Sequence, residues 1–381
     1  MARRLKVALV HELLTQLGGG ERILVEFSRM FPDAKIYTMI HDPDKIGNAI
    51  DPARVITSPL QSMPFSQQLY KWYVPVMDWA IEQFQLPDDL DLVLSDASAF
   101  AKGVRAPKGV PHLCYLHTPT RYLWSVQESY VREQPIPALI RPFVKPGLQR
   151  LKRWDYIAAQ RPHAYVANST NVAEQLQRYY DRSAEAVIFP FVDTSLFQTS
   201  TKVDDYYFIL TRLEPYKRVD LVVDACIQLG ARLKVAGSGT LLEELRVRYA
   251  DQPTIEFLGR VTDEALPDLY ANARAFIFPQ EEDAGITPLE SMAAGRPVLA
   301  YGKGGALQSV VPGVTGEFFE EQSVDSIAAA LTKYDWTSYT SKAIQAHVAQ
   351  FDVTEFRDKM HTVIETVRDR WHFQHNQPVK G

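Results

Sequence analysis

The strongest constraint on the fold is a repeated alternation of short apolar runs with longer amphipathic stretches. The apolar runs are continuous, a pattern typical of parallel strands that are covered on both faces. Strands that alternate with helices predict an α/β fold with parallel sheets and right-handed crossovers. The expected strands are residues 6–10, 35–40, 92–95, 112–116, 164–167 and 186–189, then 207–211, 233–236, 255–258, 275–278 and 297–300.

These strands fall into two sets, which predicts two Rossmann-like domains. The break lies near residues 190–205, so we place the first domain at residues 1–193 and the second at 194–350. A helix expected at residues 351–373 would pack back on the first domain. A chain of 381 residues, 46% of them hydrophobic, can form two cores. Because open parallel sheets bind ligands at the carboxyl ends of their strands, we expect the two sheets to face each other across a cleft.

Charge and cysteine content narrow the class of protein. A net charge of -5 argues against a nucleic-acid partner. Cys114 and Cys226 lie in apolar runs and are interpreted as buried thiols in a reducing compartment, without a disulfide framework. The first apolar run stops at His11 and Glu12, too early for a signal peptide, and no run approaches the roughly 20 residues of a membrane span. We therefore expect a cytoplasmic location.

A basic pair follows one strand of the second domain. Arg212 and Lys217 could bind a diphosphate, Arg212 through its planar guanidinium and Lys217 as a point charge. Such a pair would also neutralise charge on a leaving group. A solvated basic turn is the alternative. Gly237 and Gly239 follow the next strand and could open a phosphate-facing helix, although this spacing alone is a weak signal.

The strongest motif begins at Glu282 and ends at Glu290, between an expected strand and an expected helix. Gly285 and the N–H groups of Ile286 and Thr287 can face an anionic ligand. Glu290, about one turn into the helix, can accept hydrogen bonds from vicinal hydroxyls, and Glu282 lies before the turn. A solvated acidic loop is the alternative.

Two features of the first domain also follow strands. Gly18, Gly19 and Gly20 precede a helix whose N-terminus could attract a phosphate, although a plain tight turn is equally consistent. Their spacing is not G-x-G-x-x-G, which disfavours a nicotinamide cofactor. His117 ends a strand and could bind a substrate hydroxyl or orient a reacting group, whereas a structural histidine is the alternative.

Taken in this order, the motifs resemble the EX7E retaining glycosyltransferases of the GT-B fold, often called family four. The resemblance covers nearly the whole chain, and the ordered set is more specific than any one motif. Within the family, the chain is similar to bacterial mannosyltransferases that build O-antigen or exopolysaccharide repeats. The matching segments are residues 18–21, 117–124, 168–169, 212–217, 257–261, 282–290, 293–298 and 304–306.

The resemblance implies that a hexose, above all mannose, moves from a nucleotide diphosphate sugar to a glycan acceptor. It implies a catalytic set in which Arg212 and Lys217 hold the diphosphate, while Glu282 and His117 lie beside the donor sugar. Glu290 would bind the ribose. The other implied donor-binding residues are Gly19, Gly20, Gly237, Gly239, Arg260, Val261, Gly285, Ile286 and Thr287. Ala284 stands where the family usually has an aromatic or large residue.

GDP-mannose is the favoured donor, ahead of UDP-sugars, and a polyprenyl-diphosphate-linked glycan is the expected acceptor. We expect no cofactor and no metal, since the family resemblance implies that the donor phosphate accepts the acceptor's proton and the basic pair neutralises the leaving group. Asp42 with Asp44, and Asp89 with Asp91, match a metal-binding D-x-D pattern only superficially. Turn or capping roles explain these aspartates better.

Two stretches of the first domain combine cations with aromatic residues, which suits an anionic membrane surface. One runs from Leu69 to Phe84 and includes Trp72 and Trp79. The other holds Arg132, Arg141, Lys145, Arg150, Lys152 and Arg153, beside Trp154 and Tyr156. Peripheral binding to the inner face of the plasma membrane is one interpretation, and an acceptor-side surface with ordinary core aromatics is the other.

Two other functions stay open. A sugar-nucleotide 2-epimerase of GT-B shape would share both domains but would need acidic residues for proton abstraction. A non-catalytic nucleotide-sugar-binding protein would not need the whole set of Arg212, Lys217, Glu282 and Glu290.

Overall fold

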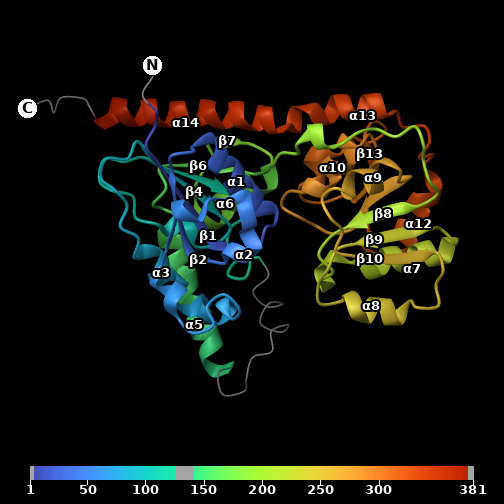
Figure 1. Cartoon of the computed structure of the whole chain (residues 1–381), viewed down its shortest axis with the longest axis horizontal. Helices are drawn as coiled ribbons and strands as arrows, with labels where there is room; N and C mark the ends of the chain where they lie inside the picture. Colours follow the sequence, from blue (N-terminus) through green and yellow to red (C-terminus); the bar gives the residue numbers. More distant parts are fainter. Residues whose placement is uncertain (1–3, 126–140, 376–381) are drawn as a thin grey trace, which may run out of the picture. The chain divides into compact units, whose positions relative to one another are not determined.

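The computed structural model describes residues 4–125 and 141–375, which form two compact units. Unit 1 contains residues 1–188 together with 357–381, and unit 2 contains residues 189–356 (Figure 1). Each unit has a parallel sheet whose strands alternate with helices along the chain. The expected class, two Rossmann-like domains, is therefore confirmed. The expected cleft between the two sheets stays a prediction.

Unit 1 is built on a sheet whose described strands lie in the order β3-β2-β1-β4-β5-β6-β7. The strands are β1 (Val7–Leu14), β2 (Lys35–His41), β3 (Val55–Thr57), β4 (Leu92–Ala97), β5 (His112–Leu116), β6 (Ala164–Ala167) and β7 (Ala186–Val187). The α-helices are α1 (Gly19–Met30), α2 (Pro43–Ile46), α3 (Met77–Glu82), α5 (Arg141–Ala158) and α6 (Thr170–Tyr180). The sequence analysis missed β3, because three residues at a sheet edge are too few to show a pattern.

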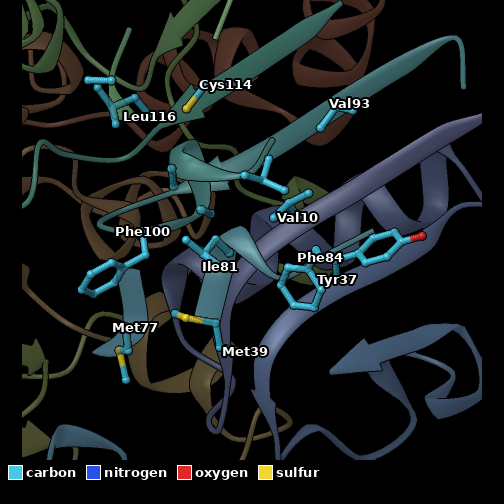
Figure 2. Packing of buried hydrophobic residues seen from close by; sticks show 14 of the residues in the cluster. Val10, Tyr37, Met39, Met77, Ile81, Phe84, Val93, Phe100, Cys114 and Leu116 are labelled. Carbon is cyan, nitrogen blue, oxygen red and sulfur yellow. The ribbon is translucent and has the colours of Figure 1, made fainter. Parts of the chain in front are cut away.

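One hydrophobic core of unit 1 lies between this sheet and its helices. Figure 2 shows Met39, Val93 and Cys114 from three strands in one buried cluster with Ile81 of α3. Phe84 belongs to the same core. The expectation that Phe84 lies on a membrane-adjacent surface is therefore wrong, because its ring fills space behind the sheet.

Unit 2 has a second parallel sheet, whose described strands lie in the order β10-β9-β8-β11-β12-β13. The strands are β8 (Tyr207–Leu210), β9 (Leu233–Ala236), β10 (Ile255–Gly259), β11 (Ala275–Phe278), β12 (Val298–Tyr301) and β13 (Gly316–Phe319). The α-helices are α7 (Val219–Leu229), α8 (Leu242–Arg248), α9 (Leu266–Ala271), α10 (Ile286–Ala293), α11 (Ala306–Ser309), α12 (Val324–Lys333) and α13 (Ser341–Val348). The sequence analysis missed β13, whose run opens with a glycine and a glutamate.

The last helix, α14 (Val353–His375), begins in unit 2 and belongs to unit 1 from Arg357 onward. Arg357 forms an ion pair with the buried carboxylate of Glu26 on α1. Further along, Arg370 donates to both carboxylate oxygens of Glu185, at 2.8 and 2.5 Å. These ion pairs hold the C-terminal part of α14 against unit 1.

Strand β1 continues through two polar residues that the sequence analysis took as the end of its apolar run. Glu12 is buried, and its Oε1 accepts the backbone N–H groups of Ser98, Ala99 and Ala101 at 2.8, 2.7 and 3.2 Å. The ring of His11 is buried and hydrogen-bonded to the carboxylate of Asp96 on β4, a neighbour of β1 in the sheet. Since both side chains have buried partners, the strand can extend beyond its apolar stretch.

A buried ion pair lies beneath the segment that follows β5. The Lys102 ammonium, fully buried, lies 2.6 Å from Asp155 Oδ1 on α5. The same carboxylate accepts hydrogen bonds from Thr120, Trp124 and Tyr180, at 2.7, 2.7 and 2.6 Å. This network ties residues 120–124 to the core of unit 1.

Replacing Lys102 with methionine should leave Asp155 as an uncompensated buried charge, which costs about 3–5 kcal/mol of unfolding free energy. Urea unfolding of the purified chain measures this change. The matched control is Lys6→Met, which breaks the exposed pair with Asp89 and should cost about 0–1 kcal/mol. Equal, small losses for both variants would show that the buried network does not stabilise unit 1.

Candidate functional site

The sheet of unit 2 brings the predicted site residues to one edge. Its strand order is that of a dinucleotide-binding Rossmann sheet, in which ligands bind where the order reverses. The reversal lies between β8 and β11, which pair in parallel. Arg212 follows β8 and Glu282 follows β11, so both residues lie at the carboxyl edge beside the reversal. Arg260 and Val261 follow β10, on the same edge beyond β9.

Two of the predicted catalytic residues are in direct contact. Lys217 ends a short 3-10 helix, and its ammonium forms an ion pair with Glu282 Oε1. The ammonium also lies 5.0 Å from the centre of the Tyr216 ring. Arg212 Nη2 donates to the Tyr216 hydroxyl oxygen at 3.4 Å. Lys217 thus lies against the Glu282 carboxylate, and Tyr216 connects it to Arg212, the second cation of this edge. Two cations so close along the chain can bind a phosphate group.

Glu290 lies on α10 with its side chain buried, and its Oε2 accepts the Tyr270 hydroxyl at 2.7 Å. The helix begins at Ile286, directly after Gly285, and Thr287 follows in its first turn. The first N–H groups of a helix have no acceptor within that helix and favour an anion. The predicted anion-facing turn and the predicted ribose-binding carboxylate therefore belong to one rigid helix.

Gly237 and Gly239 let their loop pack closely against neighbouring backbone, while their predicted role at a phosphate-facing helix start stays a prediction. Gly237 has a φ of +123°, and a Cβ there would lie 1.8 Å from the carbonyl oxygen of Thr211. A Cβ on Gly239 would lie 2.5 Å from the carbonyl oxygen of Leu213. The Leu213 N–H in turn donates to the carbonyl of Ser238, at 3.0 Å. The glycines thus let this loop lie against the backbone that carries Arg212.

The loop that carries Glu282 is held by a second glycine pair. The Gly305 N–H donates to the Glu282 carbonyl at 2.8 Å, and a Cβ on Gly304 would lie 2.2 Å from that same oxygen. A Cβ on Gly305 would lie 2.6 Å from Cα of Ala284. Ala284, the departure from the family pattern, packs against the hydrophobic core of unit 2.

Unit 1 presents its predicted residues at the carboxyl edge of its own sheet. Gly19 and Gly20 open α1, where Gly18 N–H donates to Glu21 Oε2 at 3.0 Å. A Cβ on Gly20 would lie 3.6 Å from His117 Nε2. The structure therefore brings the glycine turn and His117 together. Their relation to the site of unit 2 stays a prediction.

Burial and charge shift the pKa values around His117. Burial by itself lowers the pKa of His117, but the charge of Asp96 and the hydrogen bond to it outweigh burial and raise that pKa. Burial also opposes the charge of His11, yet Asp96, Glu12 and Glu21 raise the pKa of His11 to about 9. Burial raises the pKa of Asp96, and the two histidines reverse this and lower it.

Sequence reasoning missed four residues that support the candidate sites. They are His11, Glu12 and Asp96 in unit 1 and Tyr270 in unit 2. The available signal was a polar residue inside an apolar run that leads to a strand end, as in His11-Glu12 and Ser95-Asp96. Polar side chains there have to be paired when they are buried. Tyr270 gave no signal, because an aromatic residue on a helix is ordinarily a core residue.

Fold and site together define a GT-B protein: two parallel sheets, each with a reversal, and a cationic edge in the second. Residues 17–196 match the family model described as Glycosyltransferase Family 4, and residues 193–334 match the model described as Glycosyl transferases group 1. Together the two models cover residues 17–334, and the chain belongs to the glycosyltransferases that they describe.

Solved structures with the same fold cover almost the whole chain. Sucrose-phosphate synthase from Thermosynechococcus elongatus has a TM-score of 0.73 at 17% identity, covering 96% of this chain and 100% of that one. Anabaena HepE in complex with UDP has a TM-score of 0.69 at 19% identity, covering 95% and 100%. These similarities establish the fold.

Curated relatives match over shorter stretches. A GDP-mannose-dependent alpha-(1-6)-phosphatidylinositol monomannoside mannosyltransferase of Mycobacterium tuberculosis is 35% identical over 32% of this chain and 36% of its own length. A D-inositol 3-phosphate glycosyltransferase of Mycolicibacterium smegmatis is 26% identical over 56% of this chain and 55% of its own. The chain thus spans between about a third and about half of these relatives.

Replacing Gly237 with alanine should force Thr211 away from its present position and lower the unfolding free energy by about 2–5 kcal/mol. The control is Gly230→Ala, since Gly230 has a φ of +63° but no atom within 4 Å of a Cβ, and should cost about 1 kcal/mol. Urea unfolding of both variants measures the difference. Equal losses would show that strain at positive φ, not close backbone approach, explains the glycine.

Proposed function

We propose that this chain transfers a hexose from a nucleoside diphosphate sugar to a glycan acceptor, with retention of configuration. The observation that carries the proposal is the Lys217–Glu282 ion pair beside Arg212, at the reversal of the unit 2 sheet. Membership of the glycosyltransferase family supports it. The bound UDP in Anabaena HepE, which shares the fold, supports a nucleotide-sugar donor.

In this proposal Arg212 and Lys217 bind the donor diphosphate, together with the first N–H groups of α10. Glu290, oriented by the Tyr270 hydroxyl, accepts hydrogen bonds from the ribose hydroxyls. Glu282 exchanges its contact with Lys217 for a hydroxyl of the donor sugar. The Glu290 carboxylate is already held in place before the donor binds, which reduces the entropic cost of ordering the site.

The proposed transfer breaks the bond between the anomeric carbon and a diphosphate oxygen. An acceptor oxygen bonds to that carbon on the same face, and its proton passes to the departing diphosphate. Two cations at the leaving group neutralise the charge that develops there, so the proposed reaction needs no metal ion.

GDP-mannose is the proposed donor. The relatives from Mycobacterium tuberculosis and Mycolicibacterium smegmatis that are described as GDP-mannose-dependent are 35% and 33% identical to this chain over the matched residues. The proposed acceptor is a lipid-linked glycan of bacterial surface polysaccharide synthesis. An epimerase would instead convert the donor without any acceptor, so product analysis with the acceptor left out separates the two activities.

Lys217→Ala should lower the rate of sugar transfer by about 10²–10³-fold, because the leaving group loses one of its two cations. The assay contains EDTA, in which the unchanged chain should remain active. GDP should raise the melting temperature of the unchanged chain more than UDP does, and the variant should lose most of this shift. The control is Lys333→Ala, at the exposed end of α12.

An unchanged rate in Lys217→Ala would contradict the assigned role of this lysine. Complete loss of activity in EDTA, restored by Mg²⁺ or Mn²⁺, would contradict the metal-free reaction. Conversion of donor without acceptor would favour the epimerase.

The proposal includes peripheral membrane binding through unit 1. Phe65, Trp72 and Phe143 are 71%, 60% and 71% exposed, and Trp79 is about half exposed. Exposed aromatic side chains near cations suit the interface of an anionic bilayer. None of the described helices combines the length and apolarity needed to cross a membrane.

The two stretches of this surface are joined by hydrogen bonds between α3 and α5. Arg150 on α5 donates to both carboxylate oxygens of Asp78 on α3, at 2.7 and 3.0 Å. Trp154 Nε1 donates to Glu82 at 2.7 Å. Figure 1 shows the two helices in the same region of unit 1.

Two cations of the expected patch make contacts within the protein. Arg150 forms an ion pair with Asp78, and the Lys152 ammonium lies 4.3 Å from the centre of the Trp124 ring. Arg132 and the side chain of Arg141 lie outside the described residues. Lys145 and Arg153 are exposed on α5 and provide cations for the proposed lipid surface.

Flotation with vesicles of phosphatidylglycerol and phosphatidylcholine tests this surface at low salt. The double variant Trp72→Ser, Trp79→Ser should bind at least about tenfold more weakly, since two large side chains no longer enter the interface. Val247→Ser, which removes a 78% exposed apolar side chain in unit 2, should float like the unchanged chain. Absence of flotation for the unchanged chain would contradict membrane binding.

A further inference from the structure

A carboxylate shared by two histidines lies in unit 1, outside the residues that the family motifs identify. Asp96 is fully buried on β4 and uses both of its oxygens. Its Oδ2 lies 2.9 Å from Nδ1 of His11 on β1, and its Oδ1 lies 2.5 Å from Nε2 of His117 after β5. Three neighbouring strands therefore meet in one hydrogen-bonded group.

The position of this group in the sheet is that of a ligand site. The strand order of unit 1 reverses between β1 and β4, and His11 and Asp96 are direct partners across that pair. Open parallel sheets bind ligands beyond the carboxyl ends of the strands at such a reversal. His117 lies one strand further along, and is the member of the group that is partly exposed.

The geometry leaves one role for each member. His11 holds one oxygen of Asp96, so the carboxylate cannot turn away from His117. Asp96 in turn holds Nε2 of His117, which leaves Nδ1 as the ring nitrogen that can meet a substrate oxygen. A histidine that is fixed by a carboxylate keeps its ring orientation and tautomer without rearrangement on binding.

We propose that Asp96 and His11 are positioning residues for the transfer reaction, because they fix His117 as a cationic donor whose Nδ1–H is directed at the substrate. This inference rests on the proposed function. His117 is the residue that touches substrate, while Asp96 and His11 act through it.

Charges around the group favour the cationic form of His117. Its raised pKa means that the imidazolium is present at low pH and is lost as pH rises through that pKa. His11, with a pKa of about 9, is positive at neutral pH and opposes the charge of His117. The titratable groups that face the two rings are Glu12 from β1, Glu21 from α1, Asp96 from β4 and Tyr115 from β5.

Two variants should move the pH profile of transfer in opposite directions. Asp96→Asn removes the negative charge that raises the pKa of His117. The loss of transfer activity at alkaline pH, the alkaline limb of the profile, should therefore begin at lower pH. The value of kcat should also fall by roughly tenfold to a hundredfold. His11→Gln removes a neighbouring cation, so the alkaline limb should move to higher pH with a smaller fall in kcat. A purely structural role would lower activity in both variants without opposite shifts.

His112→Gln is the matched control. His112 is also a buried histidine of β5, bonded to Ser95 at 2.8 Å, and burial lowers its pKa to about 3. It therefore carries no charge near neutral pH, and its replacement should not move the alkaline limb. Shifts in the same direction for Asp96→Asn and His11→Gln, or a shift in the control, would overturn the inference.

Ring titration of His117 by nuclear magnetic resonance gives a readout that needs no turnover. The midpoint for His117 should lie above 6.5 in the unchanged chain, lower in Asp96→Asn and higher in His11→Gln. GDP affinity, which the proposed function assigns mainly to Arg212, Lys217 and Glu290, should not change in either variant. Absence of both GDP binding and transfer in the unchanged chain would defeat the proposed function, whereas unshifted His117 midpoints would defeat the positioning role.

Discussion

In each unit, two strands lie side by side and point the same way where the order of the sheet reverses. In unit 2 these strands are β8 and β11, and the loops after them carry Arg212, Lys217 and Glu282. In unit 1 they are β1 and β4, which carry His11 and Asp96. The connections that follow these two strands run away from each other, toward opposite edges of the sheet. The carboxyl ends of the two strands therefore stay open to a ligand. The proposed chemistry of both halves depends on this parallel pairing.

In unit 2, the loops at that edge are held by backbone contacts so close that they leave no room for a Cβ atom. Gly237 lies against the carbonyl of Thr211, and Gly305 donates its N–H to the carbonyl of Glu282. The charged side chains therefore project from backbone whose position is set before any ligand arrives. A preorganised site of this kind can stabilise developing charge without first reorganising.

Unit 1 relies more on buried carboxylates than on glycines. Glu12 accepts three backbone N–H groups of the loop after β4, and Asp155 accepts three side-chain donors in addition to Lys102. Burying a carboxylate is costly unless its oxygens are bonded, so each of these groups selects one arrangement of the loops around it. Asp96, shared by two histidines, follows the same principle beside the residue proposed to meet substrate.

The sequence by itself determined the α/β class, almost every strand and the segments with Arg212, Lys217, Glu282 and Glu290, because hydrophobic periodicity and these motifs are local. Only the tertiary structure decided that Phe84 is a core residue, that Arg150 is occupied by Asp78 and that Gly237 serves backbone packing. It also decided that Asp96 joins His11 to His117, across separations of 85 and 21 residues. Contacts of this kind depend on which strands become neighbours, and a linear pattern of residue types does not encode that adjacency.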